Sequence, residues 1–249
     1  MVPEKPIRGP QPGPDPSGAP ERAPEAVLEG SNPPPQGRFT GMNEDRLYRS
    51  LIRKGSTPQE ALVAILREEP HVPYRVALLA HLLPRTLSQE GIQELLARFN
   101  IHPLSLALQF QDRRRAMKFL RMVERGDQFI RWIGPGGKLL IQGDAEVCRL
   151  PPGLVLRGDS RITDCPRLVD LGRGLTSLFG RIQVETCESL RWLPDGLETH
   201  YLGDVLVIDC PKFVGLGLNS QIRGRLIAHG CPSFRATAAQ GAFNVVSPR

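Results

Sequence analysis

The chain lacks several features that define whole classes of protein. None of its apolar runs approaches the roughly 20 residues needed to span a bilayer, and it begins without the apolar stretch of a secretory signal. Its five histidines are scattered, and no histidine or carboxylate pattern has metal-ligand or catalytic spacing. We therefore expect a cytoplasmic protein with no membrane span, no catalytic residues, no metal and no cofactor.

Apolar residues are scarce in the first 40 positions, where proline is concentrated instead. Proline removes backbone donors, and a segment that buries so little apolar surface cannot offset the entropy of folding. The sequence predicts a disordered tail over residues 1–42. About 210 residues remain, enough for one large domain or two small ones.

Charge of one sign does not dominate, since the formal net charge is +6, and the basic excess lies between residues 44 and 131. The chain has five cysteines, an odd number, and it is too long to need a disulfide scaffold. Four of them, Cys165, Cys187, Cys210 and Cys231, are 22, 23 and 21 residues apart. Periods of this length are typical of solenoids.

Other positions repeat with the cysteines. Asp144 takes the cysteine position one repeat upstream. Apolar residues recur three and five positions before the cysteine position, with Ser160 as the one exception. A glycine stands seven positions before it in all five units: Gly137, Gly158, Gly180, Gly203 and Gly224. Leu-Pro pairs at 150–151 and 193–194 start turns that we expect glycines to close: Gly153, Gly174 and Gly196.

This pattern predicts a stack of five coils over residues 133–241, followed by a tail over 242–249. Apolar residues two apart belong to one face of a short strand, and stacking the coils about 4.8 Å apart buries that face. We expect the four cysteines to pack as small buried groups, because zinc sites use closely spaced cysteine pairs instead. Cys148 lies off the register and is expected to be partly buried.

Two segments carry a resemblance to a known family. FGRIQVETCESL (179–190) and LGDVLVIDCPKF (202–213) resemble the conserved part of cysteine-containing leucine-rich repeats, and the Leu-Pro turns are similar to those of bacterial members. The resemblance implies a parallel β-solenoid that binds a macromolecule. The repeated glycine departs from the family consensus, so a β-helix-like cross-section with a second short strand in each coil stays open.

Residues 43–132 are expected to be helical. Thr57 and Glu60 form a capping box with Pro58 at the first helical position. The sequence partly repeats after 30 residues, which favours either two helical hairpins resembling short HEAT repeats or an irregular bundle. We expect residues 129–133 to cover the open end of the solenoid. The overall expectation is an α+β fold in which a helical domain caps the solenoid.

The strand residues that alternate with the core are expected to face a partner. They mix apolar and charged groups, which suits another protein better than a nucleic-acid backbone. Leu206, Ile208 and Ile227 form the apolar centre of this face. The predicted partner-binding residues are Arg161, Arg181, Gln183, Leu206, Ile208, Arg225, Ile227 and His229.

Two alternatives to this protein-binding function remain. Arg114, Lys118, Arg121 and Arg125 follow one face of a predicted helix over 111–126, which is either a solvated face or a site for nucleic acid or another anionic partner. The third hypothesis is a secreted bacterial effector that uses residues 1–40 as an unfolded export segment.

Overall fold

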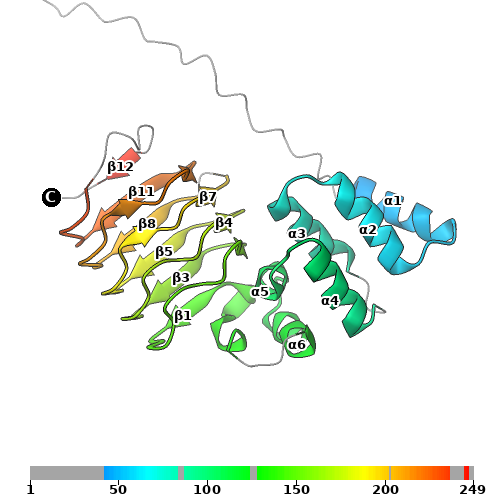
Figure 1. Ribbon diagram of the computed structural model, residues 1–249, viewed down its shortest axis with the longest axis horizontal. Helices are drawn as coiled ribbons and strands as arrows, with labels where there is room; N and C mark the ends of the chain where they lie inside the picture. The colour runs from blue at the N-terminus through cyan, green and yellow to red at the C-terminus, as the bar shows by residue number, and fades with distance from the viewer. Residues whose placement is uncertain (1–41, 84–86, 124–127, 202, 236–243, 247–249) are drawn as a thin grey trace, which may run out of the picture. The chain divides into compact units, whose positions relative to one another are not determined.

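The computed structural model describes residues 42–83, 87–123, 128–201, 203–235 and 244–246 (Figure 1). Helices come first and a parallel β-solenoid follows them, so the predicted α+β fold is confirmed. The solenoid has about four turns, where the sequence predicts five coils. The predicted disordered tail lies outside the described residues, apart from Met42, at which the first helix begins.

The helical part forms where capping residues and apolar periodicity predict it. The Thr57 hydroxyl accepts from the Glu60 amide at 3.2 Å, and the Glu60 carboxylate accepts from the Thr57 amide at 2.8 Å, as the capping box requires. The helices are α1 (Met42–Arg53), α2 (Pro58–Glu68), α3 (Val72–Leu82), α4 (Gln89–Arg98), α5 (Pro103–Ala107) and α6 (Arg113–Val123).

The 30-residue repeat corresponds to pairs of these helices. Helix α2 packs against α4, and α3 packs against α5, as in two stacked hairpins. Pro73 and Pro103 each stand in the first turn of the second helix of their pair. The second copy is shorter, because α5 has only five residues.

The solenoid is built on one long parallel sheet. Its strands follow one another in chain order, which Figure 1 shows as a ladder from β1 to β12. They are β1 (Leu140–Gln142), β3 (Ser160–Thr163), β5 (Ile182–Glu185), β8 (Val205–Ile208), β11 (Arg225–His229) and β12 (Asn244–Val246). The predicted register holds, since Ile162, Val184, Val207 and Ala228 pair in successive strands and are buried.

Each coil has two further sides that also carry short strands. A second parallel sheet contains β2 (Val155–Leu156), β4 (Thr176–Ser177), β7 (Glu198–Thr199) and β10 (Gln221–Ile222). A third contains β6 (Trp192–Leu193) and β9 (Gly215–Leu216), and an Arg149–Asp170 bridge lies on the same side. The second strand per coil that the sequence left open is therefore present, and the coil has three sides.

The cysteines form the predicted internal column. Cys165, Cys187 and Cys210 are fully buried and Cys231 is partly buried, and all four are free thiols. The Cys187 amide donates to the Cys210 sulfur at 3.4 Å, which places the two side chains in adjacent layers. Each thiol donates to the backbone carbonyl two residues before it, at 3.3–3.4 Å. Cys148 is exposed rather than partly buried, and its thiol donates to the Glu146 carbonyl at 3.5 Å.

The residue just before each cysteine position turns the chain. It has a positive φ in every coil, where the left-handed conformation favours glycine, asparagine or aspartate. The five residues are Gly143, Asp164, Thr186, Asp209 and Gly230. The predicted closing glycines of the later turn, Gly153, Gly174 and Gly196, also have positive φ.

The coils differ in length at one corner only. From the second sheet to the next strand of the long sheet, matched positions are five residues apart in the coil of Val155 and six in that of Thr176. They are seven apart in the coil of Glu198 and five in that of Gln221. The longer corners contain Phe179 and Tyr201, whose exposed rings stack at 4.8 Å.

Both ends of the solenoid are covered. At the first coil, Phe129, Ile130 and Trp132 are buried as predicted, and the Trp132 indole donates to Asp144 at 3.0 Å. At the last coil, β12 pairs in parallel with β11. Residues 244–246 lie in the predicted tail, and there they form a sixth strand that pairs with the open edge of β11 and satisfies its backbone groups.

Helix α5 joins the helical part to the solenoid through buried polar contacts. The Ser105 hydroxyl accepts from the Val155 amide at 3.0 Å, and the Gln109 amide donates to the Val155 carbonyl at 3.2 Å. Ser105 and Gln109 are both buried, so these bonds satisfy backbone groups of β2 that water cannot reach.

Candidate functional site

The predicted partner face is the outer surface of the long sheet. Leu206 pairs with Gln183 on one side and with Ile227 on the other, and Ile208 pairs with His229. These side chains therefore point the same way and lie next to one another. Leu206, Ile208 and Ile227 are half-buried, because side chains of the paired strands lie on either side of them.

Charged groups on this face are largely paired with each other. Arg161 contacts Glu185 at 2.8 Å, and Arg225 contacts Asp204 at 2.8 Å. The hydrogen bond from the Arg225 side chain is the main reason why the pKa of Asp204 lies below its usual value, and Arg181 adds to the effect. The face presents an apolar centre among charges that already have partners.

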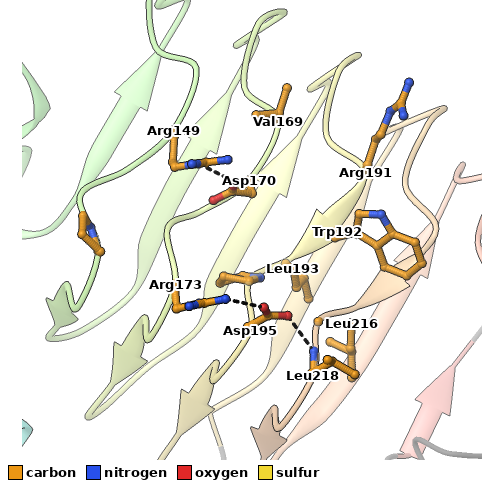
Figure 2. Close-up of a pocket in the computed structure, with 13 residues that line it drawn as sticks. Arg149, Val169, Asp170, Arg173, Arg191, Trp192, Leu193, Asp195, Leu216 and Leu218 are labelled. Atoms are coloured by element: carbon orange, nitrogen blue, oxygen red, sulfur yellow. Dashed lines mark hydrogen bonds and ion pairs between the residues drawn. The ribbon is translucent and has the colours of Figure 1, made fainter.

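A groove lies on the third side of the coils, whereas the sequence predicts the partner face on the long sheet. It has a volume of about 860 Å³ and is lined by residues of four successive coils, from segments 149–152, 169–173, 191–195 and 216–218 (Figure 2). We call it the flank groove. Its volume is within the range of about 300–1,000 Å³ that is usual for ligand sites.

Large apolar side chains stand exposed in the flank groove. Trp192 is 47% exposed and Leu218 is 75% exposed, and Val169 is also exposed. Figure 2 shows Trp192 beside Arg191, from the same coil, with Leu216 and Leu218 of the next coil nearby. Exposed aromatic and aliphatic groups gathered in a concave surface are typical of binding sites.

Ion pairs between successive coils form the other part of the groove. Arg149 contacts Asp170, and Arg173 contacts Asp195 at 3.3 Å. Asp195 also accepts from the Leu218 amide at 2.8 Å, so it links three layers, as the dashed lines in Figure 2 show. These contacts fix the position of one coil over the next along the groove.

Sequence reasoning missed the flank groove. The segments that line it are predicted to be turns, although a leucine recurs in each of them, at Leu150, Leu171, Leu193 and Leu216. The positions that the register pairs hold unlike residues, such as Arg149 with Asp170 and Trp192 with Gly215. The one available signal was Trp192, a large aromatic residue within a segment that otherwise reads as a polar turn.

The basic helix is α6, and its predicted cationic residues are partly described. Arg114, Lys118 and Arg121 are exposed along one face, whereas Arg125 lies outside the described residues. Two further arginines have structural contacts. Arg113 donates to the Ile133 carbonyl at 2.8 Å, and Arg115 lies over the Phe110 ring at 4.4 Å.

The column of thiols is not arranged as a nucleophile site. Burial raises the pKa of Cys231, and its sulfur donates to the backbone carbonyl of His229 instead of contacting the imidazole. A hydrogen bond with Cys165 lowers the pKa of Cys187, but the hydrogen bond with Cys210 and burial together outweigh it and raise the pKa to about 11. Thiols with raised pKa values are poor nucleophiles and poor metal ligands at neutral pH. The hydrogen bond with Cys187 lowers the pKa of Cys210, but this sulfur is fully buried and donates to the Ile208 carbonyl at 3.3 Å.

Comparison with protein-family models, with curated proteins and with solved structures found no match to this chain. Within the helices that the structure describes, none has the length and apolar character to cross a membrane.

Proposed function

We propose that this protein is a non-enzymatic binding module that captures another protein on its solenoid. The flank groove carries this proposal. It combines exposed Trp192 and Leu218 with arginines at its rim, and binding hot spots are rich in tryptophan and arginine.

The outer face of the long sheet is the second surface for a partner. Its centre, made of Leu206, Ile208 and Ile227, was predicted from the sequence, and the observed register supports its orientation. Its apolar groups are less exposed than those of the flank groove, and its charges are mostly paired. We therefore place the main contact in the groove.

Affinity capture with paired variants tests the function and locates the surface. Trp192→Ala with Leu218→Ser alters the groove, and Leu206→Asp with Ile208→Asp alters the sheet face. We expect the groove variant to lose the captured protein, as identified by mass spectrometry. Loss with the sheet variant alone would move the contact to the sheet face, and capture unchanged by both would contradict the proposal. Circular dichroism checks that each variant is folded.

We also infer that one side of each coil, the side that forms the long sheet, resembles cysteine-containing leucine-rich repeats. The strand of the long sheet, the turn and the buried cysteine, as in Val205–Cys210, support this likeness. The additional strands on the other two sides, such as β4 and β6, depart from it. Only the long-sheet side of the parallel β-solenoid therefore resembles these repeats.

Nucleic-acid binding is the second candidate function, and helix α6 favours it. Among the ion pairs of the described residues, none involves Arg114, Lys118 or Arg121. Three such cations on one face can contact phosphates. A gel-shift assay at low salt tests this, with Arg114, Lys118 and Arg121 replaced by Glu. The absence of any shift with the native chain would dispose of this function.

Localisation remains a proposal. We infer a cytoplasmic protein, with secretion as an effector as the alternative. The export segment of that alternative, residues 1–40, lies outside the described residues. A secretion assay with and without this segment distinguishes the two.

A further inference from the structure

We propose that the flank groove binds an extended, acidic peptide segment that carries one large apolar side chain. The inference rests on the protein-binding function proposed above and adds the chemistry of the partner. Three observations support it: the carboxylates of the groove already accept hydrogen bonds, its large apolar side chains are exposed, and its length matches a short extended peptide.

The two carboxylates of the groove are occupied by its own backbone. Asp170 accepts from the Gly172 amide at 2.6 Å as well as from Arg149. Asp195 accepts from the Leu218 amide as well as from Arg173. A carboxylate that accepts from both a backbone amide and an arginine is held in place and has fewer acceptor sites left for a ligand.

The arginines of the groove extend outward instead. The Arg173 side chain is 81% exposed, whereas that of its partner Asp195 is 42% exposed. Arg191 also lines the groove, and no carboxylate of the described part of the chain forms an ion pair with it. Each guanidinium has five N–H donors, so most of these donors stay available. The groove therefore complements carboxylates on a partner.

Trp192 supplies the apolar contact. Its indole nitrogen donates to no atom of the described residues, in contrast to that of Trp132, which is buried and donates to Asp144. A half-exposed indole next to Leu218 offers a ring face for an apolar side chain and a free donor for a backbone carbonyl. This combination suits a large side chain within a peptide.

The length of the groove suits an extended segment. Four coils at a spacing of about 4.8 Å span about 14 Å, which corresponds to about four residues of extended chain. A tetrapeptide with an acidic residue on each side of the anchor would place carboxylates near Arg191 and Arg173. Its anchor would then lie on Trp192.

A displayed library of random dodecapeptides tests the proposal with the full chain immobilised. We expect enrichment of sequences with an aromatic or leucine residue flanked by Asp or Glu. A synthetic peptide of the enriched sequence should bind about 30-fold more weakly to Trp192→Ala, as expected for a hot-spot residue. Arg191→Glu should weaken binding about tenfold, and added salt should weaken it further.

Matched controls separate these effects from general ones. Lys118→Glu on α6 makes the same charge change outside the groove, and Tyr201→Ala removes an exposed aromatic residue elsewhere on the solenoid. Both should bind the peptide within about twofold of the native chain, since neither lines the groove. Thermal unfolding by circular dichroism should show all four variants folded.

Several outcomes would overturn the inference. These are enrichment of basic or neutral sequences, no enrichment, an acidic consensus that Trp192→Ala and Arg191→Glu leave unchanged, or displacement of the peptide by single-stranded oligouridylate. If the groove variants still lose the captured protein in the affinity experiment, only the acidic chemistry fails. If the groove variant and the sheet variant both leave capture unchanged, the protein-binding function fails with it.

Discussion

Thr186 adopts a left-handed backbone conformation, with φ of 53°, at the turn before Cys187. This conformation costs an L-residue roughly 1–2 kcal/mol, and a β-branched side chain suffers most. We expect Thr186→Gly to raise the free energy of unfolding by about 0.5–1 kcal/mol. This is the strain that the change removes, less the additional conformational entropy that glycine loses on folding. Urea denaturation followed by circular dichroism measures the change.

The control for this prediction lies three residues earlier. Gln183→Gly, in the strand β5, should lower the free energy of unfolding by roughly 0.5–1 kcal/mol, because an extended residue gains nothing from glycine. Equal destabilisation by both glycines would mean that the turn does not strain Thr186.

The thiols should differ sharply in reactivity. Cys148 is exposed, whereas Cys187 is fully buried and its pKa is raised to about 11. Because only the thiolate reacts, we expect iodoacetamide at pH 8 to modify Cys148 at least about 100-fold faster than Cys187. Peptide mass spectrometry over time measures both rates. Labelling of the unfolded chain, where both thiols should react at similar rates, is the reference. Comparable rates for Cys148 and Cys187 in the native protein would contradict a buried column of cysteines.

At the scale of single elements, Asp144 connects the cap to the first coil. Burial opposes its ionisation, but hydrogen bonds from Trp132 and the backbone and the charge of Arg131 outweigh this, so its pKa lies below the usual value. A carboxylate with a lowered native pKa stabilises the fold above about pH 4, and this contribution is lost as pH falls through the native pKa.

We therefore expect Asp144→Asn to lower the free energy of unfolding by about 1–3 kcal/mol at pH 7. The difference from the native chain should shrink as the pH falls below about 4. Denaturant titrations at pH 3 to 7 measure it, with Glu188→Gln, an exposed carboxylate on a turn, as control. A difference that stays constant with pH would show that the charge of Asp144 is not involved.

The long sheet could be predicted from the sequence because its strands have a clear period of two. Ile182 and Val184, for example, recur at fixed distances before a cysteine, so both the strand and its inner face follow. The other two sheets could not be predicted. Their strands have two residues each, such as Thr176–Ser177, which is too short to show any alternation.

The candidate sites divide in the same way. Leu206 and Ile208 could be placed on one face, because local alternation decides which side a strand residue takes. The flank groove depends on residues more than 20 positions apart, such as Asp170 and Trp192, lying in adjacent coils at matched heights. The repeat pattern gives this alignment, since both residues stand five positions after a cysteine, but it does not show that this side of the coil is concave and exposes its side chains.

For the whole molecule, the core is continuous from the helices into the solenoid. Buried apolar residues form one cluster that includes Leu104 of α5 and Leu156 of β2, and Ser105 bonds the backbone of Val155. A continuous core predicts cooperative unfolding of both parts. Circular dichroism at 222 nm and tryptophan fluorescence should therefore report the same midpoint.

Ser105→Ala tests this coupling. The Val155 amide would lose its acceptor in a buried position, which should cost about 1–3 kcal/mol. Both signals should shift together to a lower midpoint, whereas Ser189→Ala, on a half-buried turn of the solenoid, should change little. Two separate midpoints in the Ser105 variant would show that the helical part and the solenoid unfold independently.

The corner that varies in length shows where this architecture tolerates additional chain. In three neighbouring coils, this corner between the second sheet and the long sheet takes five, six and seven residues, while the spacing along the rest of the coil is constant. A loop of several glycine and serine residues inserted after Tyr201 would extend a bend that is already elongated. That site could carry a fluorescent label or an epitope while the stacked layers and the flank groove on another side keep their positions.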